Sequence, residues 1–121
     1  MNGVLSESYY LNAIEFVVNE YPGIEIKILS DNDILANRLY PNLIKLTHGF
    51  YDGLDTKSPL ESFEIIRNSM VVISANSGFS LWASKLSSVI KLTVMPHKMH
   101  KTVNGFHDTP ESWVKIENKF I

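Results

Sequence analysis

The chain has 121 residues, of which 45% are hydrophobic and 20% charged, with a formal net charge of −2 and a pI near 6.0. This length and composition are ordinary for one soluble globular domain, and they lack the basic character that nucleic-acid binding requires. The absence of cysteine excludes disulfides and thiolate metal sites, and there is neither a signal pattern nor an apolar run of about 20 residues. The sequence therefore predicts a single cytoplasmic domain over residues 1–121.

The charges are unevenly distributed along the chain. Residues 1–84 carry ten acidic and five basic side chains, whereas residues 85–121 carry three acidic and six basic ones. A basic C-terminal third can attract a phosphate-bearing ligand or the anionic headgroups at a membrane surface. A solvated loop and helix face accounts for the same charges equally well.

Helical and extended patterns alternate along the first half of the chain. Ser6 or Ser8 can cap a helix that runs to about Glu20 and that Pro22 and Gly23 bring to an end. The apolar residues predicted at helical spacing are Tyr10, Ala13, Ile14, Val17 and Val18. The elements expected next are a strand over 24–29, a short helix over 34–39, a strand over 43–46 and a surface loop over 47–57.

The second half continues the alternation. Ser58, Pro59 and Glu61 form a helix start with a serine cap, a proline at the first position and a capping-box partner. The elements expected are a helix to about residue 68, a strand over 70–74, a helix over 79–86, a strand over 89–94, an irregular stretch over 95–109 and a helix over 111–119. Short apolar strands between helices predict a Rossmann-like α/β fold, with a parallel sheet covered by helices on both faces.

Ligands of such sheets bind at the carboxyl ends of the strands. The segment that follows the strand over 70–74 is rich in small polar residues and leads into a helix, whose first N–H groups are unpaired and whose dipole attracts anions. The candidate ligand-binding residues of this turn are Ser74, Asn76, Ser77, Gly78 and Ser80. Helix capping accounts for the same serines and asparagine without a ligand.

Acidic residues supply further candidates. Asp31 and Asp33 follow the strand over 24–29, where carboxylates can bond to ribose hydroxyls or base N–H groups, or can simply cap a helix. Asp52 and Asp55 lie in the long loop as candidates for a general base or a metal ligand, although surface loops commonly contain aspartate.

Histidines and tryptophans complete the set. His97, His100 and His107 do not follow a metal-binding spacing, so we expect neither a metal nor another cofactor. Trp82 follows the helical spacing of its neighbours, which favours a place in the core over sugar stacking. Trp113 is expected to pack the closing helix.

Three segments resemble motifs of the bacterial α-1,2-fucosyltransferase family, in the same order. ISANSGFSLWASKL, residues 73–86, is similar to the family's C-terminal motif, which reads roughly ANSSFSWWAAWL. SYYLNAI, residues 8–14, is similar to the YYxxAI helix, and ILSDND, residues 28–33, to the IFSDD segment. Together they cover most of residues 8–90.

The resemblance implies an inverting, metal-independent GT-B enzyme that moves fucose from GDP-fucose to a galactose-bearing glycan, with this chain as its C-terminal, donor-binding half. By the same resemblance Asp31 contacts the nucleoside, and the diphosphate pocket is lined by Ser74, Asn76, Ser77 and Ser80. The family's HxRRGD segment, which supplies an arginine to the donor phosphates shortly before the tyrosine helix, is absent. We therefore expect a fragment of a longer enzyme, with little transferase activity on its own.

A second function class fits the same fold. A non-catalytic α/β binding or assembly module would pair through exposed strand edges and apolar patches, and a homodimer is then expected. In the enzyme interpretation, catalysis comes from alignment of donor and acceptor and from stabilisation of the departing diphosphate, with Lys98 and Lys101 as candidate helpers. The response to guanine nucleotides separates the two interpretations, because only a donor-binding domain is stabilised by them.

Overall fold

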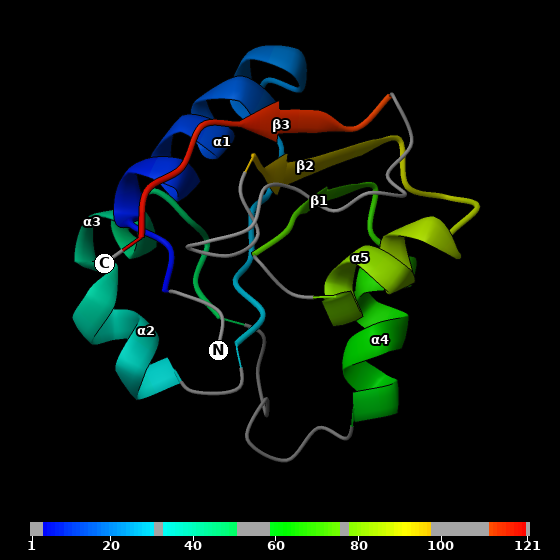
Figure 1. Cartoon of the computed structure of the whole chain (residues 1–121), viewed down its shortest axis with the longest axis horizontal. Coiled ribbons are helices and arrows are strands. Elements are labelled where there is room, and N and C mark those ends of the chain that lie inside the picture. The colour runs from blue at the N-terminus through cyan, green and yellow to red at the C-terminus, as the bar shows by residue number, and fades with distance from the viewer. Residues whose placement is uncertain (1–3, 31–32, 51–58, 76–77, 98–111, 121) are drawn as a thin grey trace.

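The computed structural model describes residues 4–30, 33–50, 59–75, 78–97 and 112–120. Its elements are α1 (Glu7–Glu20), α2 (Asp33–Leu39), α3 (Pro41–Lys45), α4 (Pro59–Arg67), β1 (Val71–Ile73), α5 (Gly78–Lys85), β2 (Leu92–Pro96) and β3 (Val114–Ile116). The strands form one sheet in the order β1-β2-β3, and both pairs are parallel (Figure 1). The predicted α/β class with a parallel sheet is confirmed.

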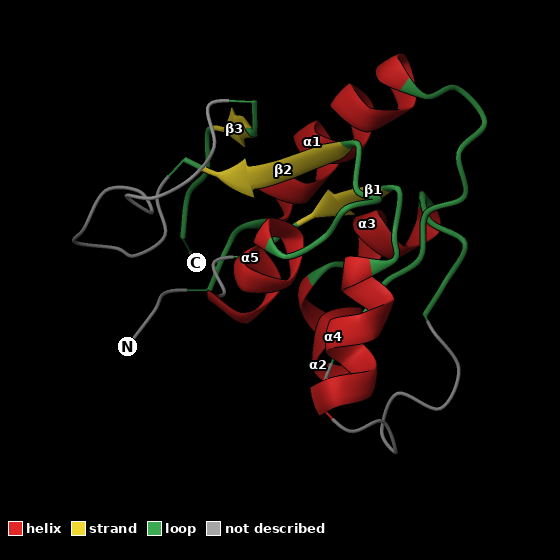
Figure 2. Ribbon diagram, turned by 90° about the vertical axis from the view of Figure 1, so that its right-hand side faces the viewer, coloured by secondary structure: helices red, strands yellow, loops and turns green. Residues whose placement is uncertain are grey.

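Helices cover both faces of this sheet. On one face Ala13 and Val17 of α1 pack with Val94 of β2, and all three side chains are almost fully buried. On the other face Ile66 of α4 and Ala83 of α5 pack with Val72 of β1. Figure 2 shows α4 and α5 beside one another on the same side of the sheet. The division follows from the strand geometry, because successive side chains point to opposite faces.

The N-terminal helix, α1, forms where the sequence predicts it, but its buried face is rotated slightly about the helix axis from the predicted one. Tyr9, Ala13, Ile14 and Val17 are buried, whereas Val18 is 41% exposed. The assignment of Val18 to the apolar face was wrong by one position. Tyr10 is half-buried in an aromatic row, with its ring centroid 4.9 Å from that of Tyr9 and 5.0 Å from that of Tyr40.

The strand predicted over 43–46 is wrong, because residues 41–45 form α3. Pro41 takes the first position of this helix, where its missing N–H is not needed. Glu7 caps the helix from 35 residues away, since its Oε2 accepts the N–H of Asn42 at 2.9 Å and that of Leu43 at 3.0 Å. Leu43 is buried, and α3 packs against α1.

The segment predicted as a strand over 24–29 is extended but lies outside the three-stranded sheet. Ile28 forms a parallel bridge with Phe50, and its N–H bonds to the carbonyl of Gly49 at 2.8 Å. His48 donates its N–H to the carbonyl of Ile26 at 2.7 Å and accepts the N–H of Ile26 on Nδ1 at 2.9 Å. Gly49 has φ +91°, a conformation that favours glycine. Residues 48–50, expected in a loop, thus pair with this segment.

The C-terminal third differs most from the sequence prediction. The helix expected over 111–119 is wrong, because residues 114–116 form β3 and pair with β2 in the register Val94↔Val114 to Pro96↔Ile116. Val114 and Ile116 are half-buried and Lys115 is exposed, which is the two-residue period of a strand. β2 itself begins three residues and ends two residues later than expected, at Leu92 and Pro96.

One serine hydroxyl closes the turn between α5 and β2. Ser87 Oγ donates to the carbonyl of Arg67 at 2.5 Å and accepts the N–H groups of Val89 and Ile90, each at 3.1 Å. We expect Ser87→Ala to lower the free energy of unfolding by about 1–2 kcal/mol, because it leaves these backbone groups without their partner. Urea unfolding measures the change, with Ser88→Ala at the exposed neighbour as the control. Equal effects of the two substitutions would contradict this function of Ser87.

Candidate functional site

The carboxyl ends of the three strands lie at one edge of the sheet, because all three run in the same direction. Ser74 follows β1, and its N–H continues the ladder to the carbonyl of Val94 at 2.8 Å. His97 follows β2 and donates its N–H to the carbonyl of Ile116 at 2.9 Å. We call this edge the carboxyl edge. Backbone hydrogen bonds connect neighbouring strands as far as Ser74 after β1, His97 after β2 and Ile116 at the end of β3.

The predicted phosphate turn begins at this edge. β1 ends at Ile73 and α5 begins at Gly78, so that the N-terminal end of α5 follows the end of β1 after four residues. Gly78 and Ser80 belong to the first turn of α5, while Asn76 and Ser77 lie outside the described residues. The order of a strand followed after a short connection by a helix is the one that the sequence predicts.

Ser74 is buried, with 1% of its surface exposed. Its Oγ donates to the carbonyl of Ala75 at 2.9 Å. The structure thus places this candidate at the base of the turn, in contact with backbone, and its predicted contact with a ligand stays a prediction.

Tyr9, which the sequence does not single out as a site residue, makes a hydrogen bond to Ser74 at the start of this turn. Tyr9 is fully buried, and its hydroxyl donates to the carbonyl of Ser74 at 2.5 Å and lies 3.5 Å from the carbonyl of Val94. Burial, followed by the nearby hydroxyl of Tyr10, raises the pKa of Tyr9 far above its usual value, so the group stays a protonated donor. Its four-residue spacing from the buried Ala13 and Val17 is the sequence signal that could have identified it.

Of the other candidate residues, His97 lies at this edge, directly after β2. Asp31, Asp52, Asp55, His100, His107, Lys98 and Lys101 lie outside the described residues. Asp33 is the first residue of α2, and His97 is exposed. Among the described residues no cluster of three potential metal ligands occurs. No helix in the described ranges is long and apolar enough to cross a membrane.

The core position predicted for Trp82 is wrong. Trp82 is 54% exposed, and Nζ of Lys85 lies 5.3 Å from its ring centroid. α5 instead buries Ala83 and Ser84, so its inner face is rotated by one residue from the predicted one. Trp113 is half-buried directly before β3 and is not part of a helix.

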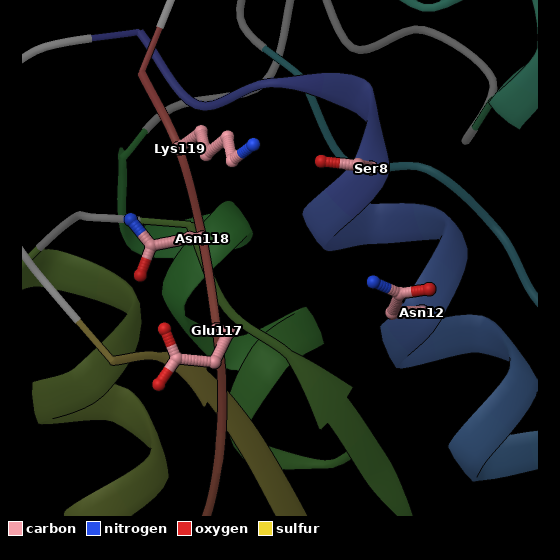
Figure 3. A pocket seen from close by; sticks show the side chains of 5 residues that line it. All are labelled: Ser8, Asn12, Glu117, Asn118 and Lys119. Carbon is pink, nitrogen blue, oxygen red and sulfur yellow. The ribbon is translucent and has the colours of Figure 1, made fainter.

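A polar pocket of about 300 Å³ lies between α1 and the residues that follow β3 (Figure 3). It is lined by Ser8, Asn12, Glu117, Asn118 and Lys119. In Figure 3 the Lys119 side chain extends towards Ser8, whereas those of Glu117 and Asn118 extend to the other side of the chain. The polar groups therefore do not converge on one point.

Comparison with known proteins relates the chain to a glycosyltransferase. It is 26% identical over 120 residues to the alpha-1,2-colitosyltransferase of Escherichia coli. The match covers 97% of this chain and 41% of that protein, so the chain spans about two-fifths of its relative's length. No protein-family model and no solved structure matches the chain.

Proposed function

We propose that this chain forms the sugar-nucleotide-binding part of an α-1,2-glycosyltransferase, with the donor bound at the carboxyl edge of the sheet. The observation that carries the proposal is the turn from β1 to α5, which starts at the buried Ser74 and brings a helix N-terminus to that edge. The similarity to a glycosyltransferase along 97% of the chain supports it.

In this proposal the carboxyl edge binds the diphosphate group of the donor. Backbone N–H groups and the positive end of the dipole at the start of α5 attract phosphate oxygens. The Asn76, Ser77 and Ser80 side chains add hydrogen bonds, and Asp31 binds the nucleoside. In the transfer, the anomeric carbon loses its bond to the diphosphate and gains one to an acceptor hydroxyl, whose proton passes to a base. The same N–H groups stabilise the negative charge that develops on the departing diphosphate.

The donor we propose is a guanosine diphosphate sugar carrying a fucosyl or a colitosyl group, and the acceptor is a galactose-containing glycan. The name of the relative supports the α-1,2 linkage and a colitosyl group, and the resemblance of three motifs supports the fucosyl group. The remaining three-fifths of the relative's length would supply the acceptor side, so this chain by itself is expected to show little turnover.

A thermal-shift titration with GDP, GDP-fucose, UDP and ADP tests the proposal. We expect guanine nucleotides to raise the melting temperature progressively as their concentration exceeds Kd, because ligand bound only to the folded state stabilises it. At about 100 times Kd the stabilisation is about 2.7 kcal/mol. UDP and ADP at the same concentrations are the controls for non-specific anion binding. Equal shifts with all four, or none, would contradict a guanosine diphosphate site.

The assembly-module alternative has its own supporting observation. Several large apolar side chains are exposed, among them Ile34 at 77%, Leu60 at 70% and Leu86 at 60%. Such side chains favour association with another surface. A module of this kind would show a concentration-dependent mass in solution and no response to guanine nucleotides.

A further inference from the structure

The Tyr9 hydroxyl lies at the point where β1 gives way to the turn. It donates to the carbonyl of Ser74, the first residue after β1, at 2.5 Å, and it lies 3.5 Å from the carbonyl of Val94 in β2. The N–H of Ser74 bonds to that same carbonyl of Val94 at 2.8 Å. Tyr9 therefore connects α1 with the carboxyl ends of two strands, across 65 positions of sequence.

Holding the Ser74 carbonyl also orients the next amide. The peptide group that joins Ser74 to Ala75 is planar, and no cis peptide bond occurs among the described residues. In a trans peptide the carbonyl and the following N–H point in opposite directions, so the N–H of Ala75 points away from Tyr9 and from the core. Ser74 Oγ holds the carbonyl of Ala75 at 2.9 Å in addition. Two successive carbonyls at the base of the turn are thus fixed by side chains.

We propose that Tyr9 is a positioning residue for the anion site at the carboxyl edge. It fixes the first peptide group of the turn, so that backbone N–H groups face the diphosphate of a sugar nucleotide before the ligand arrives. This inference rests on the proposed function. It means that α1, which contains the segment similar to the YYxxAI helix, helps to order the donor site. Donors aligned in advance bind an anion more tightly, because binding does not have to order the backbone.

Tyr40 offers a matched comparison. Its hydroxyl also donates to a backbone carbonyl, that of Leu5, at 2.7 Å, and this bond is not at the turn. Tyr9→Phe and Tyr40→Phe remove the same atom. Each hydroxyl also has a second partner, the carbonyl of Val94 at 3.5 Å for Tyr9 and the side chain of Tyr10 for Tyr40. A purely structural function of Tyr9 predicts that both variants lose stability and that neither changes the turn or ligand binding selectively.

The experiment has two independent readouts on the wild-type chain and both variants. The first is amide exchange by NMR, in which the protection of the Ser74 N–H is compared with that of the Val17 N–H in α1, together with the amide shifts of Ala75 and Gly78. The second is titration with GDP. For Tyr9→Phe we expect faster exchange at Ser74 relative to Val17, shifted resonances at Ala75 and Gly78, and about tenfold weaker GDP binding. Tyr40→Phe is expected to match the wild type in both readouts.

The outcomes separate this proposal from the proposed function. If both variants affect the turn amides equally, or if Tyr9→Phe leaves them unchanged, the positioning function is overturned even when GDP binds. If the wild-type chain does not bind GDP, the proposed function fails, and a selective change at Ser74 would then support only the ordering of the turn. Selective loosening with unchanged GDP affinity would overturn the link between Tyr9 and the ligand.

Discussion

Replacing Val17 with alanine is expected to lower the free energy of unfolding by about 2 kcal/mol. Val17 is 1% exposed and packs with Ala13 and Val94 in the core between α1 and the sheet. The substitution removes two methyl groups and leaves a cavity that the surrounding residues fill only in part. The midpoint of urea unfolding measures the loss, provided that the slope of the transition stays unchanged.

The same substitution at the next residue provides the control. Val18 is 41% exposed, so Val18→Ala removes little buried surface and replaces a β-branched residue with the strongest helix former. We expect a change between zero and about 0.5 kcal/mol, in the stabilising direction. Val17 and Val18 are neighbours in the same helix, so a larger loss at Val18 than at Val17 would show that Val18, and not Val17, faces the core.

The sequence predicted most helices because their signals are local. The cap position, the periodic apolar residues and the proline that follows place α1 within about one residue of its observed bounds. The proline at the start of α4 and the end of its helical pattern near residue 68 likewise predict the bounds of that helix to within about one residue. The alternation of these elements was sufficient to identify a parallel α/β sheet.

The errors arose where distant residues determine local structure. α3 has a local signal in Pro41, but its N-terminal cap is a carboxylate 35 residues away, which no local pattern indicates. The segment over 114–116 is a strand because β2 offers an open edge to pair with and α1 covers one face, so tertiary pairing overrode a weak helical pattern. Trp82 and Val18 were each misplaced by one position around a helix, since a helix with apolar residues on adjoining positions leaves its rotation undetermined.

The strand and the helix on either side of the candidate site were predictable, but the hydrogen bonds around them were not. The turn after β1 and the start of α5 follow from the order of apolar, small and helical residues. The bond from Tyr9 to Ser74 could not be predicted, because it requires knowing which face of α1 meets the sheet and at which level. The sequence predicts Tyr10, and not Tyr9, on the buried face of α1. Tyr9 is therefore missed, although its bond to Ser74 links two of the segments that resemble family motifs, residues 8–14 and 73–86.

Glu7 gives the second prediction with a large expected effect. Its carboxylate accepts the N–H groups of Asn42 and Leu43 on Oε2 and the side-chain amide of Asn42 on Oε1 at 3.0 Å. It is also the first residue of α1, so one negative charge lies at the N-terminal ends of two helices. We expect Glu7→Ala to lower the free energy of unfolding by about 1–2 kcal/mol, as the loss of a helix cap does. Chemical denaturation at neutral pH measures this loss.

The pH dependence distinguishes the charge from the packing of Glu7. The backbone bond from Leu43, which outweighs the cost of burial, and the bonds from Asn42 lower the pKa of Glu7 below its ordinary value of 4.5. Because the folded-state pKa is depressed, the stabilisation is complete above pH 4.5 and is lost as the pH falls through the lowered value. Glu7→Gln keeps an acceptor oxygen and cannot titrate, so its stability deficit against the wild type should shrink as the pH falls through this range. Glu15→Gln, at an exposed position of the same helix, is the control and should change stability by less than about 0.5 kcal/mol. A deficit of Glu7→Gln that stays constant down to the lowest pH at which the protein folds would show that the charge of Glu7 does not cap α3.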